Sequence, residues 1–200
     1  ETPLIKLEVE ITKLKRLVAT KPSHFRPQLD ALEQRAQKLR EDALASLSAY
    51  DIVKLSRHPK RPNTREYIDY IVSSFVELQG DRNYSDDKAI IGGLAKMDGY
   101  SLMVIGHQKG RDTAENITHN FGMPKPEGYR KCIRLMKLAE RFKIPIISLI
   151  DTPGAYPGMG AEKRGQANAI AESIECCMSL KVPNISVIIG EGGSGGAIAL

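Results

Sequence analysis

The sequence predicts an α/β fold that follows an amphipathic helical hairpin. Apolar residues recur at spacings of three and four through the first 47 residues, which is typical of helices that pack along one face. In the second half, an apolar strand, a glycine-rich loop and a helix follow one another twice, an order that indicates an α/β sheet. The 200 residues, of which 42% are hydrophobic, suffice for one core.

The composition excludes several classes of protein. Cys132, Cys176 and Cys177 have no C-x-x-C spacing, which argues against a structural zinc site and a disulfide framework. We expect a cytoplasmic protein, because no apolar run reaches the roughly 18 residues of a membrane helix and no secretory signal opens the chain. The net charge of +5 is spread along the chain, so no specific nucleic-acid binding is predicted. The start at Glu1 and the end at Leu200, inside an apolar stretch, are those expected of a fragment.

Residues 1–56 form the predicted helical hairpin arm. Two apolar stripes flank the turn-forming stretch Lys21-Pro22-Ser23-His24, and they would pack as antiparallel helices. Such a hairpin is either a plain packing element or an arm that contacts another subunit. The first stripe consists of Leu4, Leu7, Ile11, Leu14 and Val18, and the second of Leu29, Leu32, Ala36, Leu39, Ala43 and Leu47.

A basic, proline-containing stretch at 57–62 predicts a boundary, and residues 57–200 form the predicted α/β domain. Asn63 or Thr64 would cap a helix that runs to Gly80. The apolar runs 89–96 and 101–106 flank Asp98-Gly99, a pair that favours a tight β-hairpin turn.

A polar loop over 107–125 precedes a helix at 126–142, which begins with a proline beside an acidic residue. Buried strands are then predicted at 144–150 and 184–189, with a helix over about 161–180 between them. The loops 151–160 and 190–196 follow these strands. Ligands bind at the carboxyl ends of such strands, so both loops fall on the predicted binding edge.

The glycine-rich loop 190–197 fits two familiar patterns. As G-x-G-x-x-G it lacks the later acidic residue of dinucleotide sites, because the chain ends first. As G-x-S-x-G it would make Ser194 a nucleophile, although the acid and histidine of that fold follow the serine. A P-loop is excluded, because no Gly-Lys-Ser/Thr closes the loop. Without side-chain partners, the glycines still let an anion or a developing oxyanion approach backbone N–H groups.

Other polar residues have competing interpretations. The loop 151–160 also exposes backbone amides, and Asp151 at its start is a loop brace, a base or a metal ligand. Lys109 and Arg111 would either meet a ligand carboxylate or phosphate or form a solvated basic loop. The mid-helix pair Cys176-Cys177 is interpreted as packing.

Several blocks in order resemble one family. Together they closely resemble the carboxyltransferase α subunit of the multisubunit acetyl-CoA carboxylase of bacteria and plastids, over nearly the whole chain. The blocks are Gly106-His107-Gln108-Lys109-Gly110-Arg111, Asn120-Phe121-Gly122-Met123-Pro124, Pro126-Glu127-Gly128-Tyr129-Arg130-Lys131, Ile150-Asp151-Thr152-Pro153-Gly154-Ala155-Tyr156-Pro157-Gly158, Gly160-Ala161-Glu162, Arg164-Gly165-Gln166 and residues 190–197.

The resemblance implies a crotonase-like fold (the ClpP/crotonase type) of repeated ββα units. It implies transfer of a carboxyl group from carboxybiotin to acetyl-CoA, which gives malonyl-CoA for fatty acid synthesis. It also implies a β subunit with a zinc ribbon as partner in an α2β2 assembly, and biotin on a separate biotin carboxyl carrier protein. An ATP-using biotin carboxylase would load that biotin. The cytoplasm, or the stroma in a plastid-bearing source, would be the location.

For the site, the resemblance implies that Gly154 or Ala155 and Gly195 or Gly196 supply backbone oxyanion donors. Gly192, Gly193 and Tyr156, with Lys109 and Arg111, are the predicted substrate-binding residues, and no metal is expected on this chain. Two alternatives stay open at this stage. One is a hydrolase that depends on Ser194, and the other is a non-catalytic assembly subunit.

Overall fold

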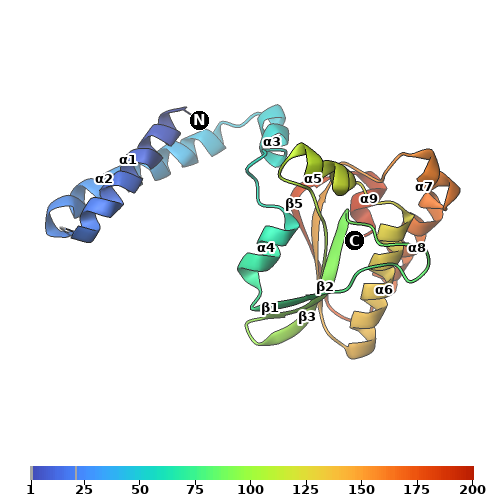
Figure 1. The fold of residues 1–200 in the computed structure, drawn as a ribbon. Helices are drawn as coiled ribbons and strands as arrows, with labels where there is room; N and C mark the ends of the chain where they lie inside the picture. The colour runs from blue at the N-terminus through green and yellow to red at the C-terminus, as the bar shows by residue number, and fades with distance from the viewer. Residues whose placement is uncertain (1, 21) are drawn as a thin grey trace. The chain divides into compact units, whose positions relative to one another are not determined.

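The computed structural model describes residues 2–20 and 22–200, which divide into two compact units, residues 1–55 and 56–200 (Figure 1). The first unit is helical and the second is an α/β domain.

The helical unit is built on an antiparallel hairpin of α1 (Thr2–Thr20) and α2 (Pro22–Ala45), followed by α3 (Ala49–Ser56), which ends at the unit boundary. The predicted stripes meet: Ile11, Leu29 and Ala36 are buried together. Ion pairs from Lys15 to Glu33 (2.9 Å) and from Arg40 to Glu8 (2.8 Å) fix the antiparallel direction.

The hairpin departs from prediction in two details. Leu39 and Ala43 are exposed, so the second stripe packs only over its first half. Pro22, predicted in a turn, begins α2, as proline often does at a helix start. Lys21 and the side chains of Leu4 and His24 lie outside the described residues.

The α/β unit contains a five-stranded sheet in the order β1-β2-β3-β4-β5. The first three strands are antiparallel, and β3, β4 and β5 are parallel. The strands are β1 (Ser74–Glu77), β2 (Ile90–Met97), β3 (Tyr100–His107), β4 (Ile146–Thr152) and β5 (Asn184–Gly192). The helices are α4 (Thr64–Ile71), α5 (Thr113–Thr118), the 3-10 turn η1 (Asn120–Gly122), α6 (Pro126–Phe142), α7 (Met159–Lys163), α8 (Gln166–Ser179) and α9 (Ser194–Ile198).

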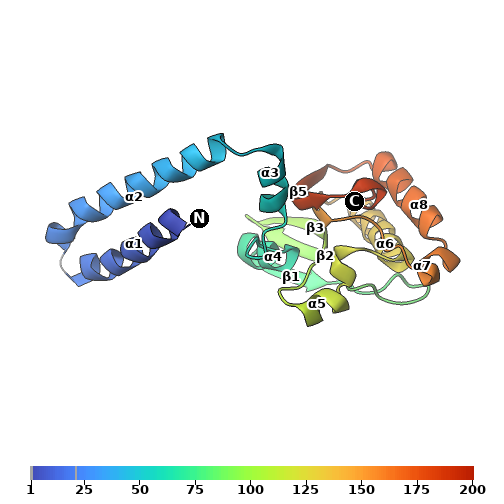
Figure 2. The same cartoon turned by 90° about the horizontal axis from the view of Figure 1, so that it is seen from above.

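Helices cover both faces of the sheet (Figures 1 and 2). On one face α6 and α8 pack over β2, β3 and β4, in a core that contains Met103, Ile105, Tyr129 and Leu135. On the other face Ile68 of α4 packs over Val104 and neighbouring residues. The alternation along β3 therefore sends Met103, Ile105 and His107 toward α6, because successive side chains point to opposite faces.

The predicted hairpin and the helix 126–142 are confirmed. β2 and β3 pair in register through Met97 and Tyr100, and Asp98 and Gly99 take the positive φ angles, 49° and 84°, that the tight turn requires. α6 has the predicted bounds, with Pro126 in its first turn.

The predicted helix 64–80 is wrong beyond Ile71. Asn63 caps α4 with its side chain, as predicted, and Glu66 completes a capping box. At Val72 the backbone becomes extended (φ −111°, ψ 145°), and the next residues form β1 on the edge of β2. Pairing with Lys96, whose carbonyl accepts from the Ser73 amide at 2.7 Å, overrides the helical spacing.

Other boundaries also differ from prediction. The strand predicted over 144–150 runs over Ile146–Thr152, so Asp151 and Thr152, predicted at the start of a loop, belong to β4. The polar loop 107–125 contains α5, which Asp112 caps by accepting from the Glu115 amide at 2.8 Å, and η1. The helix predicted over 161–180 is two helices, because Gly165 adopts a left-handed conformation (φ 81°) between α7 and α8. β5 continues three residues beyond its predicted end, to Gly192.

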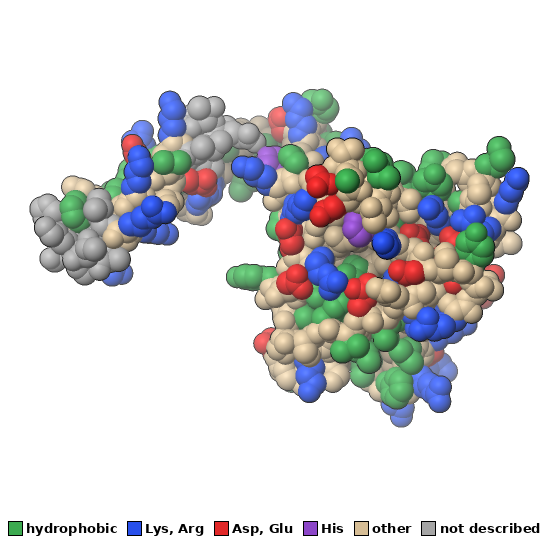
Figure 3. All heavy atoms as spheres, viewed as in Figure 1, with side chains coloured by type: hydrophobic (Ala, Val, Ile, Leu, Met, Phe, Trp, Pro, Cys, Tyr) green, Lys and Arg blue, Asp and Glu red, His purple; other side chains and the backbone are tan. Residues whose placement is uncertain are grey.

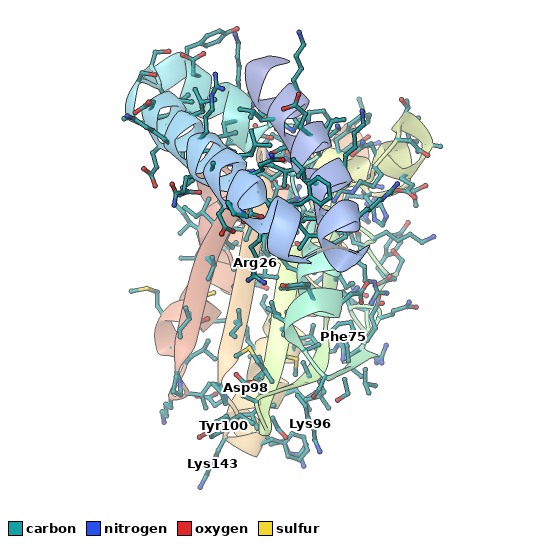
Figure 4. The ribbon with its side chains drawn as sticks, turned by 90° about the vertical axis from the view of Figure 1, so that its left-hand side faces the viewer. Arg26, Phe75, Lys96, Asp98, Tyr100 and Lys143 are labelled. Atoms are coloured by element: carbon teal, nitrogen blue, oxygen red, sulfur yellow. The ribbon has the colours of Figure 1, made fainter. Side chains whose placement is uncertain are left out.

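Figure 4 locates the end of the sheet that lies away from the predicted binding loops. Asp98 and Tyr100 of the hairpin turn lie there with Lys143, the residue that caps the end of α6. β3 and β4 begin at this end and run to the opposite one. Both predicted binding loops therefore lie at one edge, as expected for parallel strands.

Candidate active site

The loops that follow β4 and β5 lie against each other at the carboxyl edge of the sheet. Thr152 is the register partner of Gly192. The Gly193 amide donates to the Thr152 carbonyl at 2.8 Å, which extends the strand pairing into the loops. Two segments separated by about 40 residues in the sequence are thus joined backbone to backbone.

The contact between the loops leaves no room for side chains at two glycines. A Cβ on Gly196 would lie 2.9 Å from the Ala155 nitrogen and 2.9 Å from the Gly154 carbonyl carbon. A Cβ on Gly193 would lie 2.8 Å from the Gly154 nitrogen. Real Cβ atoms do not approach backbone this closely, so glycine is required at both positions.

The structure distinguishes between the four predicted backbone donors. The Gly154 amide already donates to the Thr152 hydroxyl at 3.0 Å. In the described residues no hydrogen-bond acceptor faces the amides of Ala155, Gly195 and Gly196. Gly195 and Gly196 lie in the first turn of α9, where backbone N–H groups have no partner within the helix. Of the predicted pair Gly154 and Ala155, the donor with free capacity is therefore Ala155.

The Lys109 side chain links the ends of the two strands that precede these loops. Its ammonium lies 2.7 Å from Asp151 Oδ1 and 2.7 Å from Glu191 Oε2, and the three side chains are 21%, 11% and 14% exposed. Asp151 Oδ1 also accepts from the Glu191 amide at 3.0 Å. Because Asp151 and Glu191 are the next-to-last residues of β4 and β5, this cluster, the Lys109 clamp, fixes the spacing of the loops.

Electrostatics keep Glu191 of the clamp ionised. Burial acts to raise the pKa of Glu191, but the contacts with Lys109, and with Arg57 at 2.6 Å, outweigh it and hold the pKa below its ordinary value. The Glu191 carboxylate is therefore charged at neutral pH. Asp151 acts as a brace between the loops, one of the roles that the sequence left open.

Arg111 also forms internal contacts. Its guanidinium pairs with Glu66, the capping residue of α4, and donates to the Arg61 carbonyl at 2.7 Å. Figure 3 shows Lys and Arg side chains interspersed with Asp and Glu on this face of the unit. The structure thus brings Lys109 to the loops as a brace and places Arg111 beside α4, and a role for either in substrate binding stays a prediction.

The remaining predicted substrate residues surround the loops. Tyr156 is half-buried, its amide donates to the Pro124 carbonyl at 3.0 Å, and the Lys125 ammonium lies 5.2 Å from its ring centre. Gly192 is exposed and Gly193 half-buried. Gly193 lies in the contact between the loops, and a role of these three residues in substrate binding stays a prediction.

Two buried polar side chains near the loops were not predicted as site residues. The Tyr129 hydroxyl has no hydrogen-bond partner in the part of the chain that the structure describes. The ring nitrogens of His107 make no well-formed hydrogen bond there, although backbone groups of Gly196 and Leu149 lie close enough to act on its pKa. Burial raises the pKa of Tyr129 and lowers that of His107 from 6.5 to about 3, so both are neutral at physiological pH. Helical spacing from Pro126 and alternation along β3 would have placed both in the core, and the missing partners are visible only in the structure.

Ser194 has one feature of a nucleophile, a positive φ of 52°. Its side chain is exposed, and no histidine side chain in the described residues bonds to it. His107, the histidine at the end of β3, is fully buried. The described geometry therefore supplies Ser194 with no general base.

The described residues contain no group of three or more His, Cys, Asp or Glu side chains arranged to hold a metal ion. Among them no helix is long and apolar enough to cross a membrane.

The mixed sheet, with α6 and α8 on one face and paired backbone loops at its carboxyl edge, is the crotonase-like fold of carboxyltransferases. The chain belongs to the family described as acetyl co-enzyme A carboxylase carboxyltransferase-like, whose model matches residues 1–200. The fold class and family predicted from the sequence are confirmed.

Individual proteins show the same similarity. The chain is 54% identical over 200 residues to an acetyl-coenzyme A carboxylase carboxyl transferase subunit alpha from Methylococcus capsulatus, and 53% identical over 201 residues to one from Caulobacter vibrioides. It aligns over its full length and spans 62% and 63% of these relatives. A transcarboxylase 12S structure with hydrolysed methylmalonyl-coenzyme A bound covers 75% of this chain at a TM-score of 0.60 and 22% identity, with 27% of that chain covered, and this likeness shows the fold.

The Lys109 clamp leads to a prediction about stability. Lys109→Met keeps the length of the side chain but leaves two carboxylates without their cation, so the free energy of unfolding should fall by about 1–3 kcal/mol. Urea denaturation at neutral pH measures it. Arg65→Met, which breaks the more exposed 2.9 Å pair with Glu77, is the matched control and should cost less than about 1 kcal/mol. Equal losses in the two variants would contradict a clamp.

His107 leads to a prediction about pH. The unfolded chain protonates this ring below about pH 6.5, whereas the folded chain does so only near a pKa of about 3. The unfolded state therefore binds more protons in between, and His107 should lower the unfolding free energy by about 1.4 kcal/mol per pH unit as pH falls below 6.5. Urea denaturation between about pH 5 and 7 tests this: His107→Gln should remove this slope and His119→Gln should keep it. A His107 ring that titrates near pH 6 by NMR would refute it.

Proposed function

We propose that this chain is the α half of a carboxyltransferase that moves a carboxyl group from carboxybiotin to acetyl-CoA to give malonyl-CoA. The observation that carries the proposal is the pair of facing loops, in which the amides of Ala155, Gly195 and Gly196 have no acceptor while the backbones are locked together. The family of the chain and the names of its relatives support it.

Biotin, when carboxylated, supplies an activated carboxyl group and a ureido oxygen that gains negative charge as the carboxyl group leaves. The free amides of Ala155 and of Gly195 or Gly196 fit that oxygen, because they are preorganised donors that need no reorientation. One such donor contributes roughly 3 kcal/mol to a transition state with oxyanion character. The Lys109 clamp holds the spacing of these donors, and Gly192, Gly193 and Tyr156 form the rim around the ligand.

The described part of the chain offers donors for this step and no obvious proton acceptor beside them. Asp151 and Glu191 are both engaged by Lys109, and His107 is buried and neutral. We therefore propose that the acyl-CoA is held by a second subunit of similar fold, the zinc-ribbon β subunit, in an α2β2 assembly. In this proposal biotin arrives on its carrier protein after a separate biotin carboxylase has loaded it, and it is not attached to this chain.

The test is the reverse reaction, carboxyl transfer from malonyl-CoA to free biotin, which avoids the carrier and the ATP-dependent step. The complete product of the gene should be active with its co-expressed β partner and inactive alone. A stable complex without transfer activity would refute the proposed function and favour an assembly role. Hydrolytic activity of the chain alone that is lost in Ser194→Ala would favour a hydrolase.

The close contact at Gly196 predicts which glycine is most sensitive. Gly196→Ala would push its Cβ into the backbone of residues 154 and 155, displace at least one donor, and lower kcat by about 10²-fold to 10³-fold. Gly195→Ala should cost less than about tenfold, because its Cβ would lie 3.4 Å from the Ile170 side chain, close to an ordinary contact.

Gly160→Ala is the control, because its Cβ would meet only the flexible end of Arg164, at 3.3 Å, and its activity should match wild type. Gel filtration with the β partner confirms that each variant assembles. Equal losses in Gly195→Ala and Gly196→Ala would show that the contact between the loops does not position the donors.

A further inference from the structure

Tyr129 is a fully buried residue of α6 whose hydroxyl has no hydrogen-bond partner in the described residues. A buried hydroxyl without a partner destabilises the folded state, and a phenylalanine would fill the same core position without that cost. Packing alone therefore does not explain the oxygen atom. Such groups in native proteins call for a functional explanation.

The location of the hydroxyl supplies one. A Cβ on Gly196 would lie 3.0 Å from the Tyr129 oxygen, 2.9 Å from the Ala155 nitrogen and 2.9 Å from the Gly154 carbonyl carbon. The hydroxyl therefore occupies the same side of Gly196 as the Gly154–Ala155 peptide. It lies at the point where the two loops touch.

The helix that carries Tyr129 is held firmly at this end. Lys131, which is also fully buried, donates to Asp86 at 2.8 Å and to the Ile90 carbonyl at 2.9 Å. Glu127 pairs with Arg164, and Arg130 with Asp81 at 3.1 Å. A ring carried by so constrained a helix turn has little freedom to move away from the loops.

His107 shows that this layer of the domain tolerates polar groups. It points to the same face of the sheet as Ile105, which packs with Tyr129, and its ring faces backbone groups of Gly196 and Leu149, which act to raise its pKa against the larger effect of burial. Burial of either polar group in a purely apolar layer would cost free energy without a compensating contact. Two buried polar side chains next to one pair of loops indicate that they help to position those loops.

Resting on the proposed function, we propose that Tyr129 is a positioning residue of the carboxyl-transfer site: its hydroxyl holds the Gly154–Ala155 peptide at a fixed distance from Gly196 and so aligns the amides of Ala155 and Gly196. The hydroxyl oxygen lies beside Gly196, in the space between the loops where a Cβ on Gly196 would overlap its neighbours. Without it the loops can close together, and the donor spacing changes. Tyr129 itself does not touch the substrate.

The test compares Tyr129→Phe with wild type in the complex with the β partner, by the malonyl-CoA and biotin assay. We expect kcat to fall between about 10-fold and 100-fold, because small displacements of positioned groups have effects of this size. KM for malonyl-CoA should stay within twofold, because the proposal places that substrate on the β subunit. The melting temperature should be unchanged or higher, because the variant removes an unpaired buried hydroxyl.

Tyr67→Phe is the matched control, a half-buried tyrosine of α4 on the other face of the sheet, and it should behave as wild type. A kcat for Tyr129→Phe within twofold of wild type would overturn the inference, as would a kcat loss accompanied by a lower melting temperature, which indicates a structural role. If the wild-type complex itself shows no transfer, the proposed function fails instead. The two failures are thus distinguishable.

Discussion

The site depends on one steric constraint, the direct contact of two backbones. Gly193 and Gly196 lie so close to residues 153–155 that a single Cβ at either position would overlap main-chain atoms. The rest of the domain maintains this contact: parallel pairing of β4 and β5 brings the loops together, and the Lys109 clamp ties their ends. Tyr129 of α6 packs beside Gly196, where the two loops meet. Charge and packing act here on geometry, and the proposed chemistry rests on the amide groups.

The sequence predicted those features that depend on local pattern. The Asp98-Gly99 turn, the cap at Asn63 and the bounds of α6 follow from residues close in the chain, and the structure has all three. β1 was missed because its conformation is set by an edge of β2 some 20 residues away, which competes with a helical spacing.

The sequence predicted that the two glycine-rich loops share one edge of the sheet, which the structure has, and it did not distinguish between their individual amides. Glycine content pointed to the amides, but the Thr152 hydroxyl that occupies the Gly154 amide is a feature of the folded loop. The positive charge of Lys109 suits both a ligand-binding residue and a solvated loop residue. Only its distances to Asp151 and Glu191 show that it braces the loops. Unpaired groups such as Tyr129 leave no sequence signal, because partners come from distant segments.

A site whose donors are main-chain amides has an unusual relation to mutation. Every residue except proline carries an N–H group, so a change of side chain at Ala155 does not delete a donor, whereas a bulky change at Gly196 distorts the backbone. Side chains around the loops can therefore change without loss of a donor, whereas the glycines in the contact between the loops cannot be replaced. Under the proposed function, an inhibitor that bound only the amides would leave few single substitutions by which the protein could escape it and keep that function.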